Sequence, residues 1–155
     1  MPQNESDQNS NDAGDLLAAP NRIAELQSIA STLPTWDLTE RQLCDLELLL
    51  NGGFAPLTGF LGRADFESVC KNMRLTNGAI WPIPITLDVS REFGDVVSAG
   101  DQIALRHPEG MNLAVLTVSD AWEPDKQAEA QSVYATTDEK HPAVFTLNHL
   151  TGPMY

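Results

Sequence analysis

The sequence has few cationic residues, and this shortage argues against several classes of partner. Lysine and arginine together number 9 in 155 residues, against 22 aspartates and glutamates, so the formal net charge is −13. Proteins that bind nucleic acids or anionic membranes use clustered Lys and Arg to contact the phosphates. We therefore expect neither kind of partner, and we interpret the acidity as a charged, solvated surface.

Cysteines, long apolar runs and targeting signals are also scarce. The two cysteines, Cys44 and Cys70, do not form a Cys-x-x-Cys pair, which argues against a zinc site. No apolar run approaches the ~20 residues of a membrane span, and the N-terminus lacks the basic start and apolar centre of a signal peptide. We expect two buried thiols in a reducing compartment, and hence a cytoplasmic location.

What is present indicates one folded domain after a polar tail. Residues 1–15 consist almost wholly of Asn, Gln, Ser, Asp and similar residues, so we expect a disordered tail there. The remaining chain has enough apolar residues for a core, since 42% of the whole sequence is hydrophobic.

The clearest local pattern lies in the stretch LTERQLCDLELLLNGG, residues 38–53. Thr39 and Gln42 match the capping box that begins a helix. Leucines then recur at helical spacing, and Asn51, Gly52 and Gly53 supply the left-handed backbone that a helix end needs. The pattern therefore predicts a capped amphipathic helix with Asp45 and Glu47 facing water.

Other patterns predict a mixture of short helices and strands. Helices are expected within residues 16–31 (with Asn21 as the cap), 63–72, 125–134 and 141–150, the last with Pro142 in its first turn. Strands are expected at 85–89, near 102–106 and at 113–118, the last two as a hairpin around the turn HPEGMN. The absence of βαβ alternation favours an α+β fold with a small barrel-like sheet and flanking helices.

A search for reactive groups finds no marked active site. Gly52-Gly53 follows a helix instead of opening one, so it does not form a phosphate loop. The histidines His107, His141 and His149 lack metal-ligand spacing and are interpreted as structural or exposed. Asp88 and Asp138 are the acids placed most like site residues, although turn or capping roles are favoured for both. In the stretch 81–84, WPIP, anchoring of the tryptophan in the core is favoured over a peptide-docking face.

Three stretches closely resemble the N-terminal domain of ATP sulfurylase (sulfate adenylyltransferase): LTERQLCDLELLLNGGFAPLTGFL, RLTNGAIWPIPITLDV and the segment 100–144. The resemblance covers most of the chain after Leu33, while residues 1–31 match poorly. It implies a PUA-like fold for residues 16–155. The LPTW stretch at 33–36 is similar to bacterial forms fused to an adenylylsulfate kinase. His107 departs from the family pattern, because an acid often follows the strand arginine there.

The family joins sulfate to ATP, and its reactive motifs belong to a following nucleotidyltransferase domain that this sequence does not contain. The resemblance therefore implies a scaffold with no catalytic, cofactor-binding or metal-binding residues of its own. MgATP is expected only for the full-length enzyme, and the expected partners are the catalytic domain of the same enzyme and further copies of it. PUA domains elsewhere bind RNA, but the acidic charge argues against that role here. The alternatives are a free-standing PUA-like binding module and a small enzyme that uses Asp88 or Asp138.

Overall fold

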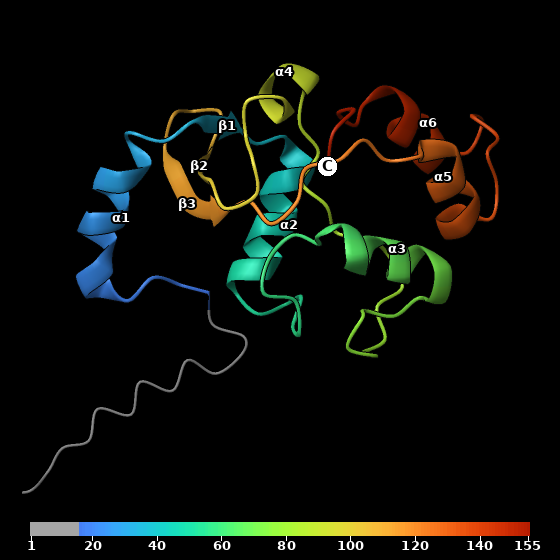
Figure 1. Cartoon of the computed structure of the whole chain (residues 1–155), viewed down its shortest axis with the longest axis horizontal. Coiled ribbons are helices and arrows are strands. Elements are labelled where there is room, and N and C mark those ends of the chain that lie inside the picture. Colours follow the sequence, from blue (N-terminus) through green and yellow to red (C-terminus); the bar gives the residue numbers. More distant parts are fainter. Residues whose placement is uncertain (1–15) are drawn as a thin grey trace, which may run out of the picture.

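The computed structural model describes residues 16–155, so the predicted disordered tail at residues 1–15 lies outside the described part. In chain order the elements are η1 Pro20–Arg22, α1 Ile23–Ala30, β1 Thr35–Asp37, α2 Glu40–Leu50, α3 Arg63–Asn72, α4 Arg91–Gly94, β2 Gln102–Arg106, β3 Asn112–Thr117, α5 Lys126–Tyr134 and α6 Pro142–His149. Figure 1 shows the sheet and α1 on one side of α2, with α3, α5 and α6 on the other.

The sheet has three strands in the order β1-β2-β3. β2 pairs in parallel with β1 and antiparallel with β3, and the register shifts at Leu105/Arg106. As the central strand, β2 buries three consecutive residues, Ile103, Ala104 and Leu105. The α+β class is thus confirmed. The sheet is open, however, and the strands of residues 16–155 form no closed barrel, so the barrel part of the prediction is not confirmed.

Helix α2 begins and ends as its sequence predicts. Thr39 Oγ1 accepts a hydrogen bond from the backbone N–H of Gln42, and the Gln42 side chain accepts one from the backbone N–H of Thr39. At the other end Gly52 has φ +79°, which a residue with a Cβ rarely adopts. Glu47 is exposed as expected, whereas Asp45 is half-buried beside Arg41.

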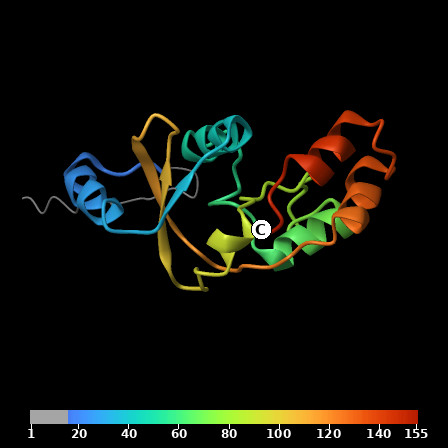
Figure 2. The ribbon, with the colours of Figure 1, turned by 90° about the horizontal axis from the view of Figure 1, so that it is seen from above.

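Three hydrophobic clusters lie on successive parts of the molecule. The first joins the sheet to α2 and includes Leu38, Leu46 and Ile103. The second joins α2 to the loop before α3 and to α3 itself. The third lies among α3, α5, α6 and Tyr155. Figure 2 shows α5 and α6 side by side at the end of the molecule opposite α1, and the C-terminal residues therefore contribute to the core of this helical end.

Most predicted elements are confirmed, among them the hairpin, whose turn contains Gly110 at φ +98°. Two details are wrong. Residues 85–89 form no strand; Val89 makes one isolated bridge to Met154, and the Asp88 carbonyl is bound by a side chain instead of a strand. Asn21 does not cap α1, because it lies within η1 and the residue at the cap position, Arg22, makes no capping bond.

Candidate functional site

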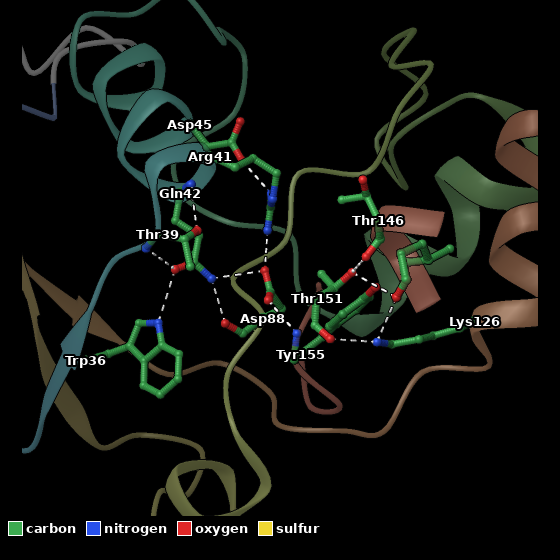
Figure 3. A network of polar contacts seen from close by, with 12 residues as sticks. Trp36, Thr39, Arg41, Gln42, Asp45, Asp88, Lys126, Thr146, Thr151 and Tyr155 are labelled. Atoms are coloured by element: carbon green, nitrogen blue, oxygen red, sulfur yellow. Dashed lines mark hydrogen bonds and ion pairs between the residues drawn. The ribbon is translucent and has the colours of Figure 1, made fainter. Parts of the chain in front are cut away.

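The most elaborate polar cluster is centred on Asp88, one of the two acids that the sequence placed most like site residues (Figure 3). Its side chain is only 7% exposed and pairs with Arg41 of α2. It also accepts hydrogen bonds from Gln42 Nε2 at 3.0 Å and from the backbone N–H of Gly152 at 2.6 Å. We call Arg41, Gln42, Asp88 and Gly152 the Asp88 network. Because its oxygens are already occupied by donors, Asp88 acts as a cross-link between α2 and the C-terminal residues, not as a free base.

Gln42 connects this network to the start of α2. The side chain is fully buried, and its amide nitrogen also donates to the Asp88 carbonyl oxygen at 2.6 Å. Its amide oxygen accepts from the Thr39 N–H at 3.0 Å and from Trp36 Nε1 at 3.2 Å. The capping box signalled only the first of these acceptor contacts. Burial of an amide requires such partners, so Gln42 fixes β1, α2 and the residue 88 region relative to one another.

A second polar cluster, which the sequence analysis missed, surrounds Glu129 on α5. Glu129 is 8% exposed, and its Oε2 accepts a hydrogen bond from the Tyr155 hydroxyl at 2.9 Å. Burial raises the pKa of Glu129 to about 7, against the opposing effects of the Tyr155 bond and of Lys126. One turn earlier, Lys126 Nζ donates to the carbonyl oxygens of Leu147 and Thr151, both at 2.9 Å. The pattern of α5 is weakly amphipathic, which is why no sequence signal singled out Glu129.

The other candidate residues have structural or exposed positions. Asp138 Oδ1 accepts from the Lys140 N–H at 2.9 Å, which is a turn role, as favoured from the sequence. His107 lies in the hairpin turn, His141 stacks on Tyr134, and His149 lies 3.1 Å from Glu139. The described residues include no group of three or more His, Cys, Asp or Glu that would hold a metal.

The cysteine and tryptophan expectations have different outcomes. Both cysteines are free, but Cys44 is exposed on α2, so the prediction of two buried thiols is wrong for it. Burial raises the pKa of the half-buried Cys70 thiol to about 12. Trp81 packs edge-on against Phe54 with ring centroids 5.6 Å apart, as core anchoring requires.

No helix within residues 16–155 is both long and apolar enough to cross a membrane.

The cationic side chains do not fit a nucleotide triphosphate. All nine lie within the described residues. Arg41 contacts two carboxylates, and Arg74 donates to the Gly78 carbonyl oxygen. The other arginines pair with acids at 2.6–2.9 Å: Arg22 with Glu25, Arg63 with Glu67, Arg91 with Glu123 and Arg106 with Asp37. Triphosphate binding needs convergent donors, and the six arginine side chains are already engaged with other groups.

One concave region of the surface is mainly apolar. A cavity of about 560 Å³ lies between α1, the end of α2 and β3, with Leu26, Leu50 and Leu113 in its wall. It contains no cluster of polar groups that would orient a reacting substrate. The chemistry of the described residues is thus that of a packed framework with an apolar surface groove.

Comparison with known proteins agrees with this framework. The family described as the PUA-like domain matches residues 8–155. The chain belongs to this family.

Several relatives named sulfate adenylyltransferase are similar to the domain. The protein of Eremothecium gossypii is 55% identical over 81% of this chain and 25% of its own length. That of Saccharomyces cerevisiae is 44% identical over 92% of this chain and 27% of its own. A bacterial relative, from a Synechococcus strain, is 44% identical over 89% and 36%.

Among solved structures, the hexameric APS kinase from Thiobacillus denitrificans superposes with a TM-score of 0.64. It is 40% identical to this PUA-like domain and covers 68% of it, which is 22% of that chain. The domain therefore spans only about a quarter to a third of the length of the curated relatives that it matches.

Proposed function

We propose that this PUA-like domain is the non-catalytic N-terminal scaffold of a sulfate adenylyltransferase, the enzyme that joins sulfate to ATP and releases pyrophosphate. One observation carries the proposal: relatives of 44–55% identity have this name, while the domain spans only 25–36% of their length. On this proposal residues 16–155 are the scaffold domain, and the reaction requires the remaining part of the enzyme with MgATP.

The side-chain geometry supports a scaffold over a catalytic role. Asp88, one of the two acids placed most like site residues, has its oxygens occupied by donors from α2 and Gly152. The arginines are bound to carboxylates or a carbonyl, so the transfer of an adenylyl group would lack the cationic donors that stabilise its developing charge. The third interpretation, a small enzyme that uses Asp88 or Asp138, thereby loses its physical basis.

The proposed partner is the catalytic domain of the same polypeptide. Further copies of the enzyme are proposed partners as well, since the solved relative is described as hexameric and as an APS kinase. That description also agrees with the fused adenylylsulfate kinase suggested by residues 33–36. A cytoplasmic location is proposed because both cysteines are unpaired, as in a reducing compartment.

The test is an assay of pyrophosphate release with ATP and sulfate. The 155-residue chain alone is expected to give no turnover above background, whereas a full-length relative under the same conditions turns over. A second measurement adds the chain to a relative from which the matching segment has been removed, and binding is measured by calorimetry. Turnover by the chain alone, or failure of the two parts to associate, would contradict the scaffold assignment. Failure to associate would favour a free-standing binding module.

A further inference from the structure

The C-terminal segment, residues 151–155, is held in place by side chains from two other parts of the chain, α5 and the region of residue 88 (Figure 3). Lys126 of α5 donates to the Thr151 carbonyl oxygen, and Asp88 accepts from the Gly152 N–H. Tyr155 donates its hydroxyl hydrogen to Glu129. The Tyr155–Glu129 contact uses a buried acid, so the attachment of this segment can respond to protonation of Glu129.

Backbone bonds hold the same segment from two sides. Val89 and Met154 exchange two hydrogen bonds of 2.8 and 3.3 Å, and Trp122 and Tyr155 exchange two of 2.9 Å. The Tyr155 ring also packs against Trp122, with centroids 5.9 Å apart, and against Phe66, at 5.7 Å. The segment can separate from α5 only if these contacts open together with the Tyr155–Glu129 bond, which makes it a cooperative unit.

Glu129 is the acid buried inside this unit, and it lies close to water. It lines an open groove between α3 and α5 together with Cys70 and Lys71. The charged and titratable groups that interact with it come from several parts of the chain: Lys126 and Tyr134 of α5, Cys70 of α3, Arg41 of α2, Asp88, and Tyr155 itself. A proton can therefore leave through the groove while the carboxylate that remains is still poorly solvated.

We propose that Glu129 and Tyr155 form a pH-sensitive latch, which releases the C-terminal segment from α5 when the Glu129 carboxyl loses its proton. In the closed state the neutral carboxyl accepts the Tyr155 hydroxyl with little desolvation cost. Once ionised, the carboxylate gains solvation by opening toward water, and opening separates Tyr155 from α5. The latch does not depend on the proposed scaffold function. If that function holds, the segment leads toward the catalytic domain, and the latch would alter how the two domains are joined.

The size of the effect follows from the two protonation equilibria. Burial sets the pKa of Glu129 at about 7 in the closed state, against 4.5 for an exposed glutamate, so the open population rises about 20-fold between pH 5.5 and pH 7.5. The thiol of Cys70 and the hydroxyls of Tyr134 and Tyr155 have raised pKa values, so they stay neutral in this range.

The test measures protection of the Trp122 and Tyr155 amide hydrogens against exchange, corrected for the intrinsic rate at each pH. In the unmodified chain the protection factor of Tyr155 is expected to fall about 20-fold from pH 5.5 to pH 7.5. Glu129→Gln keeps the shape and an acceptor oxygen but does not titrate, so its protection is expected to stay constant. Glu67→Gln changes an exposed acid of the same groove and is expected to behave like the unmodified chain.

Two outcomes would overturn the latch. One is a protection factor that does not change with pH in the unmodified chain. The other is a pH-dependent fall that persists in Glu129→Gln, which would assign the effect to a group other than Glu129. Should Glu129→Gln fail to fold, the carboxyl carbon of Glu129 is titrated by NMR in the unmodified chain and in Tyr155→Phe. The latch requires that the Glu129 carboxyl titrates with a midpoint near 7 in the unmodified chain. The midpoint should rise in Tyr155→Phe, because the Tyr155 hydrogen bond favours the ionised carboxylate. A midpoint below 5 in the unmodified chain refutes the latch.

Discussion

Replacement of Asp88 by alanine removes the centre of the Asp88 network, and its cost can be worked out contact by contact. The Gly152 N–H, now 2.6 Å from a carboxylate oxygen, is left without that acceptor, at about 2 kcal/mol. The Gln42 amide loses one acceptor but keeps the backbone carbonyl of residue 88, so this loss is about 1 kcal/mol. Arg41 is 43% exposed and keeps Asp45, so its share is well under 1 kcal/mol.

The free energy of unfolding should therefore fall by about 3 kcal/mol, and the melting temperature by roughly 6–12 °C for a chain of this size. Urea denaturation followed by circular dichroism measures the change. The matched control is Asp138→Ala, which removes an exposed acid from a turn and is expected to cost under about 1 kcal/mol. If the two variants lost equal stability, the proposed role of Asp88 as a cross-link would be wrong.

Four further changes test other parts of the fold. Gly152→Ala should destabilise the domain by about 2 kcal/mol or more, since a Cβ there would overlap the Val89 carbonyl oxygen; urea denaturation measures it. Thr39→Ala should cost about 1 kcal/mol through loss of the α2 cap. Leu105→Ala, in the buried centre of the sheet, should cost about 3 kcal/mol. Folding raises the pKa of Glu129 to about 7, so its contribution to the free energy of unfolding is complete below pH ~4.5 and is lost as the pH rises through 7. The loss amounts to about 3 kcal/mol in all. This pH-dependent loss of stability should be absent from Glu129→Gln.

The elements predicted correctly from sequence are those whose signals are local. The capping box of Thr39 and Gln42, the turn at Gly110 and the range of α3 all depend on residues within a few positions of one another. β1 was missed because Thr35–Asp37 is too short to show alternation and pairs with a strand far along the chain. Residues 85–89 have strand-like composition but lack a neighbouring strand to pair with, and no local signal reports that.

The polar clusters show the same limit more sharply. Asp88 was singled out as site-like because it follows an apolar run, yet its partners are 46, 47 and 64 residues away in sequence. Glu129 lies on a helix whose polar residues all suggest exposure, but the tertiary fold buries it and places it against Tyr155. Contacts of this kind depend on the tertiary fold, so composition and spacing do not reveal whether an acid is catalytic, structural or poised to titrate.

The scaffold proposal depends on which existing contacts the arginine side chains would have to break in order to bind phosphate. Arg41 would have to leave Asp88, and this would deprive a carboxylate that is only 7% exposed of its counter-ion. The exposed pairs cost little to break, but Arg22, Arg63, Arg91 and Arg106 lie on four different elements, η1, α3, α4 and β2. A triphosphate needs several donors at one place, and these arginines do not converge on one place. On the scaffold proposal, the groups that bind the phosphates of ATP belong to the remaining part of the enzyme.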